Sequence, residues 1–297
     1  MQDLHGYVPA IATPFNDKGE IMEDAFVELF EFLLARGATC VCIAGDNGES
    51  WALSAPERGR LVRLAKDTSK GRVPIMMGIS APTIDASVAY IRAAEENGAD
   101  ALLSMPQTYV LKASEAELMG RFDKISVATN KPLVLYNSPR RMGFSLTIDQ
   151  TEKLLDHHNI IGIKESQRDF FYHTHLLHRL SHRLAVMTGP CHYIMPAFGL
   201  GAKGFIATGP EFTDLWPSEM AKVGAGIPDE TYRHAHYQLT VLYELLMSLG
   251  TWPAAFKAAL NLIGLPAGVP RDPVYALASD NIDKIKKTFD QLGISYS

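Results

Sequence analysis

Short apolar runs alternate with longer amphipathic stretches along most of the chain. The apolar runs predict strands at residues 8–13, 39–44, 74–79, 101–105, 132–137, 160–164, 184–188 and 204–208. Between them, stretches such as residues 24–36, 56–70, 83–97 and 115–129 repeat their apolar positions with the period of a helix. Because strand and helix alternate strictly, the pattern predicts a parallel sheet covered by helices.

The number of these units favours a closed barrel. About eight strand and helix pairs fit a (β/α)8 TIM barrel, and no GxGxxG turn of the kind found in many open doubly wound sheets follows the first strand. Gly-Ala pairs that begin at Gly37, Gly98 and Gly201 stand between a predicted helix and the next strand, where glycine can take the left-handed conformation that ends a helix. We therefore expect the α/β class and a (β/α)8 TIM barrel.

The last part of the sequence differs from the rest. Residues 229–249, 252–263 and 279–293 have helical periodicity, and no apolar strand-like run separates them. We expect residues 1–225 to form the barrel that carries the active site, and residues 226–297 to form a C-terminal helical appendage.

Composition narrows the range of partners. The 297-residue chain has a formal net charge of −5 and a pI near 6.1, and it has no long Lys/Arg run, so nucleic acid is not an expected partner. No apolar stretch reaches the roughly 18 residues of a membrane span, and the N-terminus lacks the apolar core of a signal peptide. We expect a cytoplasmic protein without a membrane partner.

Two short spacings are compatible with a metal site. Cys40 and Cys42 alternate along a predicted strand without a CxxC pair, and His178 and His182 are four residues apart on a predicted helix without an HExxH motif. Buried reduced thiols and a solvated helix face are the favoured explanations of these residues. We expect neither a metal nor a cofactor.

The polar residues at strand ends are the candidates for chemistry, because a TIM barrel carries its active site at the carboxyl ends of its strands. Lys164 directly follows an apolar run, where desolvation should lower its pKa toward a nucleophilic free amine. By alternation, Gly162 shares its face and leaves room, while Glu165 points to the other side. A lysine that extends to the rim or pairs with a carboxylate is the alternative interpretation.

Two other strand ends carry polar groups. The loop Gly45-Asp46-Asn47-Gly48-Glu49-Ser50 has backbone N–H groups that could hold a carboxylate, although an ordinary polar turn would look the same. Tyr136, at the end of the fifth strand, could transfer protons or simply pack. Beyond it, Arg140 and Arg141 could bind a carboxylate or form an exposed, solvated pair.

Taken together, these segments are similar to a known family. Residues 45–50, the Leu-Tyr-Asn-Ser-Pro segment at 135–139 and the Gly-Ile-Lys-Glu-Ser segment at 162–166 resemble the dihydrodipicolinate synthase/N-acetylneuraminate lyase family, in order and at the matching strand ends. The resemblance covers the barrel and its helical tail. It implies a lyase in which Lys164 forms a Schiff base with a small 2-oxo acid and Tyr136 moves protons. It further implies a homotetramer built from dimers.

The resemblance also implies a set of substrate-binding residues and shows where this chain departs from the family. The implied residues are Asp46, Asn47, Gly48, Thr108, Arg141, Gly189 and Ile206. Family synthases usually have Thr-Thr where Asp46 and Asn47 stand, and Thr108 takes the place of a relay tyrosine, with Tyr109 displaced by one. Arg141 matches the arginine that those synthases use for the carboxylate of the second substrate.

Several functions remain open on this basis. We expect aldol cleavage, aldol condensation or dehydration of a hydroxylated 2-oxo acid, through an imine with pyruvate or a longer 2-oxo acid. The alternatives are a true 4-hydroxy-tetrahydrodipicolinate synthase, which condenses pyruvate with aspartate semialdehyde, and a non-catalytic paralogue that binds a 2-oxo or sugar acid. A metal-dependent aldolase is a third alternative, which the lack of a metal-ligand motif disfavours.

Overall fold

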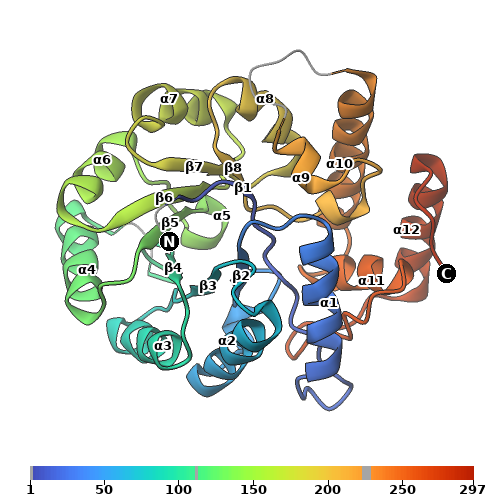
Figure 1. Ribbon diagram of the computed structural model, residues 1–297, viewed down its shortest axis with the longest axis horizontal. Coiled ribbons are helices and arrows are strands. Elements are labelled where there is room, and N and C mark those ends of the chain that lie inside the picture. The colour runs from blue at the N-terminus through green and yellow to red at the C-terminus, as the bar shows by residue number, and fades with distance from the viewer. Residues whose placement is uncertain (1–2, 111–112, 223–228) are drawn as a thin grey trace.

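A computed structural model describes residues 3–110, 113–222 and 229–297 of the chain. Within these residues, parallel strands form one sheet with the order β1-β8-β7-β6-β5-β4-β3-β2, and helices surround it (Figure 1). The strands are β1 Gly6–Tyr7, β2 Val41–Ile43, β3 Ile75–Gly78, β4 Ala101–Ser104, β5 Leu133–Asn137, β6 Ile160–Glu165, β7 Ala185–Thr188 and β8 Gly204–Phe205. Nearly every strand residue is buried, as expected for a sheet covered on both faces.

Hydrogen bonds between the first two strand segments close the sheet into a barrel. The N–H of Thr39 donates to Tyr7 O at 2.8 Å, and the N–H of Cys42 donates to Pro9 O at 2.9 Å. The prediction of a (β/α)8 barrel is thereby confirmed. The predicted first strand, residues 8–13, began too late, because the regular ladder is limited to Gly6–Tyr7 and Pro9 has no N–H with which to continue it.

The outer helices begin and end where local sequence signals place them. They are α1 Glu23–Ala35, α2 Ala55–Ser69, α3 Ile84–Glu96, α4 Glu115–Ala128, α5 Pro139–Met142, α6 Ile148–His157, α7 Phe170–Leu180, α8 Ile194–Gly199 and α9 Pro217–Met220. Ser54 caps α2 through a reciprocal hydrogen-bonded box with Glu57. Gly37 and Gly98 take φ values of 81° and 85°, so the predicted left-handed positions after these helices are confirmed.

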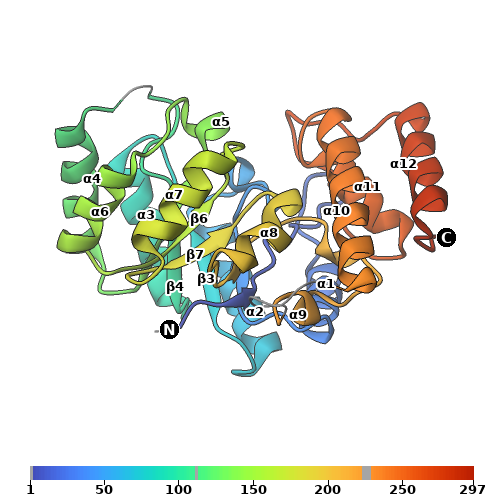
Figure 2. The same cartoon turned by 90° about the horizontal axis from the view of Figure 1, so that it is seen from above.

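Three further helices follow the barrel: α10 Glu230–Ser248, α11 Ala254–Leu262 and α12 Ser279–Leu292. They stand together on one side of the barrel in both views (Figures 1 and 2). The predicted boundary between residues 225 and 226 lies outside the described residues, and the division into two domains stays a prediction. No helix in the described part of the chain is long and apolar enough to span a membrane.

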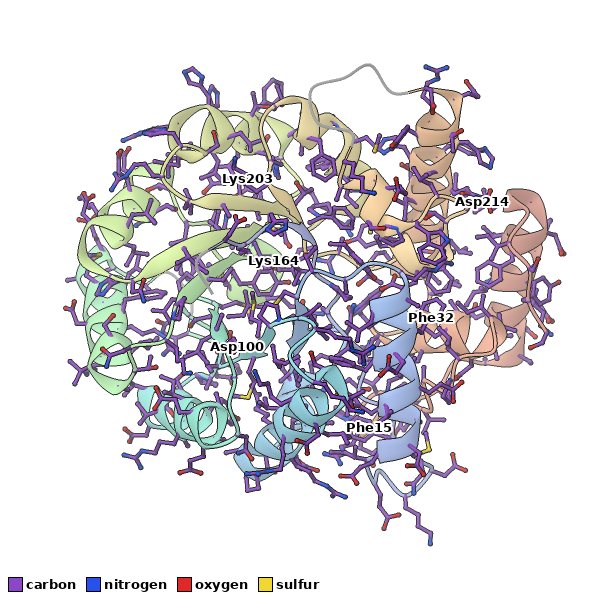
Figure 3. All side chains as sticks on the ribbon, viewed as in Figure 1. Phe15, Phe32, Asp100, Lys164, Lys203 and Asp214 are labelled. Atoms are coloured by element: carbon purple, nitrogen blue, oxygen red, sulfur yellow. The ribbon has the colours of Figure 1, made fainter. Side chains whose placement is uncertain are left out.

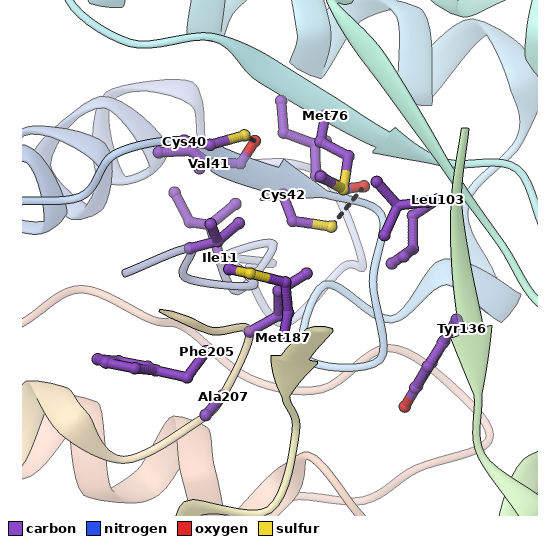
Figure 4. Packing of buried hydrophobic residues seen from close by; sticks show 14 of the residues in the cluster. Ile11, Cys40, Val41, Cys42, Met76, Leu103, Tyr136, Met187, Phe205 and Ala207 are labelled. Carbon is purple, nitrogen blue, oxygen red and sulfur yellow. Dashed lines mark hydrogen bonds between the residues drawn. The ribbon is translucent and has the colours of Figure 1, made fainter. Parts of the chain in front are cut away.

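Sulfur-containing and aliphatic side chains fill the barrel. Figure 4 shows Cys42, Met187 and Ile11 packed between the strands, with Tyr136 nearby on β5. The cysteines are free and buried, as expected. At Gly162 a Cβ would lie 2.7 Å from Leu4 Cδ2, so the missing side chain makes room for the N-terminal segment rather than for the lysine amine.

Candidate active site

Lys164 and Tyr136 are direct neighbours across two parallel strands. Residue Leu133 of β5 pairs with Ile160 of β6, but the next pair is Val134 with Gly162, so Ile161 is an extra residue that forms a bulge. The bulge shifts the register by one position and thereby pairs Tyr136 with Lys164. The two side chains share one face, and the lysine Nζ lies 4.3 Å from the centre of the tyrosine ring.

The amine of Lys164 is enclosed by the barrel. Lys164 is only 6 % exposed, and Figure 3 shows this residue within the ring of strands. Burial lowers the pKa of Lys164 below its usual range, since water no longer stabilises the charged form, and the guanidinium of Arg141 lowers it further. Asp46 and Cys42 oppose this shift. The result is an amine that loses its proton more easily than an exposed lysine, which suits a nucleophile.

Asp46 connects the tyrosine to the arginine. The hydroxyl of Tyr136 donates to Asp46 Oδ2 at 2.8 Å, and Arg141 Nε donates to the same oxygen at 3.1 Å. Burial raises the pKa of Tyr136, and the nearby Asp46 carboxylate raises it further. The phenol therefore stays protonated and points its proton at a carboxylate, while part of the positive charge of Arg141 is already balanced.

The side chain of Asn47 holds the active-site loop in place. Its Nδ2 donates to Ala10 O at 2.9 Å and to Thr208 Oγ1 at 2.6 Å, and its Oδ1 accepts from Trp252 Nε1 at 3.1 Å. Both amide hydrogens are thus used within the protein. The backbone N–H of Asn47, which lines the pocket, has no acceptor among the described residues and is free to bind a carboxylate.

A polar pocket of about 60 Å³ opens above Lys164. Its lining consists of Asp46, Asn47, Tyr136, Ser138, Arg140, Arg141, Lys164, Ser166, Gly189, Ile206, Ala207, Thr208, Tyr243, Met247 and Trp252. The structure thus brings together most of the residues expected from the sequence, from the ends of five strands and the loops that follow them. Their individual roles stay predictions.

Two of the expected substrate-binding residues lie outside this pocket. Gly48 packs against the barrel, where a Cβ would lie 3.0 Å from Ile11 O. Thr108 is half-buried, and its hydroxyl has no hydrogen-bond partner among the described residues. Tyr109 is 87 % exposed and has a φ of 71°, so its ring turns outward from the barrel. Neither Thr108 nor Tyr109 therefore supplies a relay group to the pocket of its own chain.

Among the lining residues that the sequence did not single out, Tyr243, Met247 and Trp252 lie outside the barrel. They come from α10 and the turn after it, so the C-terminal helices form one wall of the pocket. Tyr243 and Met247 are four residues apart and share a helix face, which was the one local signal available. Glu165 points away from the pocket, as expected, and accepts a hydrogen bond from Asn137 Nδ2 at 2.7 Å. The described residues contain no cluster of three or more His, Cys, Asp or Glu that could hold a metal.

Comparison with known proteins identifies the family. The sequence model of the dihydrodipicolinate synthetase family matches residues 3–292. The chain belongs to this family. A 4-hydroxy-tetrahydrodipicolinate synthase from Desulfotalea psychrophila is 32% identical over 99% of this chain and 98% of its own length. The corresponding synthase from Methanocaldococcus jannaschii is 31% identical over 97% and 99%.

The structural comparison agrees. The chloride-inhibited dihydrodipicolinate synthase from Acinetobacter baumannii, solved in complex with pyruvate, has a TM-score of 0.91 and 26% identity, with 99% of this chain and 100% of that chain covered. The predicted family resemblance is confirmed, and the protein is a lyase of the class I aldolase type. The predicted homotetramer and the cytoplasmic location stay predictions.

Proposed function

We propose that this lyase forms an imine between Lys164 and pyruvate or a longer 2-oxo acid, and that it cleaves or dehydrates a hydroxylated 2-oxo acid. The observation that carries the proposal is the pairing of Tyr136 with Lys164, which sets a buried amine beside a protonated phenol. The free backbone N–H group of Asn47, which lines the pocket, would hold the carboxylate next to the oxo group.

The chemistry follows from charge. The neutral Lys164 amine attacks the C2 carbonyl, and the oxygen leaves as water once protonated, with Tyr136 as the proposed proton carrier. The resulting protonated imine accepts an electron pair. In aldol cleavage, the C4 hydroxyl gives up its proton, the C3–C4 bond breaks, an aldehyde leaves, and C3 of the resulting enamine takes up a proton to restore the imine. In dehydration, a proton leaves C3 and hydroxide leaves C4. Hydrolysis of the imine then releases the product and restores the amine.

Asp46 supports a hydroxylated substrate. Its carboxylate accepts from Tyr136 and could receive, through that phenol, the proton of a substrate hydroxyl. It also occupies Nε of Arg141, the arginine that the resemblance assigns to a second carboxylate. A further negative charge at that place makes binding of another anion directly to Arg141 less favourable than in a pocket without Asp46.

True 4-hydroxy-tetrahydrodipicolinate synthesis is the second candidate, because the relatives at 32% and 31% identity carry that name. The position of Arg141 in the pocket lining also suits a substrate with a carboxylate. Against it stand Asp46, which changes the predicted proton relay, and Thr108, which lies outside the pocket.

One experiment tests the imine and a second tests the substrate. The protein is incubated with pyruvate and reduced with borohydride, and its intact mass is then measured by mass spectrometry, with Lys164→Ala as the control. A stable adduct on the native chain alone is expected; its absence with pyruvate and with every other 2-oxo acid would overturn the mechanism. Turnover is then compared among 4-hydroxy-2-oxo acids, 2-keto-3-deoxy sugar acids, and pyruvate with aspartate semialdehyde. If the last pair reacts fastest by far, the protein is a synthase.

A further inference from the structure

A groove next to the active pocket extends toward the C-terminal helices. Its volume is about 440 Å³, and it shares two lining residues, Tyr243 and Met247, with the pocket above Lys164. The pocket itself, at about 60 Å³, is well below the roughly 300–1,000 Å³ that sites for larger ligands occupy. The groove is therefore the neighbouring space that could take the distal end of a substrate longer than pyruvate.

Two arginines near Tyr243, which lines both the pocket and the groove, have no ion-pair partner among the described residues. Arg168, in the loop between β6 and α7, has its guanidinium 5.7 Å from the ring centre of Tyr243 and lowers the pKa of that phenol. Arg140 lies close enough to influence the same phenol, whose pKa both arginines lower against the larger effect of burial. Among the described residues, neither Arg140 nor Arg168 forms an ion pair, in contrast to Arg141, which binds Asp46.

The groove also holds a neutral donor. His192 lies in its lining, with its ring 5.8 Å from that of Tyr243. Burial lowers the pKa of His192, and the neighbouring Arg168 and His236 lower it further, while Glu244 opposes them. The imidazole is therefore neutral near pH 7 and can donate one hydrogen bond without adding charge.

The charges of the two linings do not balance. The cationic groups are Arg140, Arg141, Lys164 and Arg168, and the carboxylates are Asp46 and Glu244. The lining of the described residues thus has an excess of two positive charges when Lys164 is protonated, as it also is in an imine. The carboxylate of a 2-oxo acid neutralises one of them. Within the groove lining Arg168 and Glu244 balance, so the second charge lies in the pocket lining, where Arg140 has no ion-pair partner among the described residues, although the protein as a whole is acidic.

We infer that the groove binds a second anionic group, a carboxylate or a phosphate, at the distal end of the 2-oxo acid substrate. Arg168 is the residue that determines this specificity, and Tyr243 and His192 donate further hydrogen bonds. A guanidinium suits this task, since it binds carboxylate and phosphate oxygens through paired N–H groups. The inference rests on the proposed function, because the anionic end can enter the groove only if the oxo end lies at Lys164.

The test compares 2-oxo acids of equal length that differ at one end. Imine formation is measured by borohydride trapping and intact mass, as a function of concentration, for 2-oxoglutarate and 2-oxoadipate against 2-oxopentanoate and 2-oxohexanoate. A phosphonate-ended 2-oxo acid forms a further arm, which distinguishes a carboxylate site from a phosphate site. The expected result is half-saturation by at least one of the anion-ended acids at a concentration about tenfold lower than for its methyl-ended partner.

Substitution of Arg168 tests whether this residue causes the preference for anion-ended acids. In Arg168→Gln the ratio of the two half-saturating concentrations should fall toward one, whereas Arg168→Lys should keep part of it. Arg92→Gln, at an exposed arginine on α3 remote from the groove, is the matched control and should keep the full ratio. A ratio of one in the native protein, or a ratio that persists in Arg168→Gln, overturns the inference. An adduct with pyruvate in the same experiment shows that the proposed function survives; if pyruvate and all other acids fail to react, both fall together.

Discussion

The Nζ of Lys257 lies 2.5 Å from Oε1 of Glu49, and both side chains are almost completely buried. Lys257 belongs to α11, and Glu49 belongs to the loop that carries Asp46 and Asn47. The amine also donates to Thr13 O and Val269 O at 2.7 Å each, and the N–H of Arg271 donates to Glu49 Oε2 at 2.8 Å. Lys257 of α11 and the backbone of Arg271 therefore hold the active-site loop in place, in addition to the contact between Trp252 and Asn47.

Removal of the Lys257 amine should destabilise the protein strongly. In Lys257→Met the carboxylate of Glu49 would stay buried without its counter-ion, which costs about 3–5 kcal/mol in the free energy of unfolding. The matched control is Lys153→Met, since Lys153 lies 2.6 Å from Glu115 but both side chains are about half exposed, at 51% and 49%. A loss of no more than about 1 kcal/mol is expected there. Chemical denaturation of both variants tests this, and equal losses would show that burial of the pair is unimportant.

Substitution of Asp46 should change the pH at which Lys164 reacts. The Asp46 carboxylate raises the pKa of Lys164 against the effect of burial, and Arg141 lowers it. In Asp46→Asn the raising effect disappears and Arg141 loses its counter-ion, so both changes lower this pKa further. Because the neutral amine is the nucleophile, the acidic limb of the rate of imine formation with pyruvate should move to lower pH.

Trapping rates measured across pH check this expectation, with Asp149→Asn on the exposed face of α6 as the control. The position of the limb is the readout rather than the absolute rate, since the substitution also alters the pocket. A limb that moves to higher pH, or one that moves equally in the control, contradicts the electrostatic explanation.

The sequence was sufficient for the strand-and-helix order and for the strand ends that carry chemistry. Buried strands such as Leu133–Asn137 are apolar on both faces, and outer helices carry capping residues such as Ser54, so local signals agree with the fold. Lys164 and Tyr136 were predictable as candidates for the same reason, since each directly ends an apolar run.

The arrangement of those residues was not predictable. Strict alternation from the pair Leu133 and Ile160 would set Lys164 opposite Asn137, and only the bulge at Ile161 moves it opposite Tyr136. The pattern of apolar residues is the same with or without that bulge. The ion pair between Lys257 and Glu49 joins residues that are distant in the sequence, and no local pattern reports such a contact.

Closure of the barrel depends on a close approach of two glycines. Gly204 of β8 pairs with Gly6 of β1, and a Cβ on Gly204 would lie 2.2 Å from Gly6 O. Gly204→Ala should therefore lower the free energy of unfolding by about 1–3 kcal/mol or more, because backbone must move to admit the methyl group. Gly120→Ala, inside α4 with open space around it, should raise it by about 0.5–1 kcal/mol. Thermal or chemical unfolding of the two variants should give shifts of opposite sign; a neutral Gly204→Ala would mean that the strands can separate without cost.

Tyr136→Phe should separate imine formation from proton transfer. The ring that lies over Lys164 remains in this variant, but the hydroxyl that donates to Asp46 is lost. Borohydride should still trap pyruvate on Lys164, whereas exchange of the pyruvate methyl protons with solvent deuterium, which requires the enamine, should slow by about 10²–10⁴-fold. Proton NMR follows the exchange, and Lys164→Ala, which should lose both trapping and exchange, is the control. If Tyr136→Phe exchanges as fast as the native protein, another group carries the proton, and Ser138, Ser166 and Asp46 in the same pocket lining become the candidates.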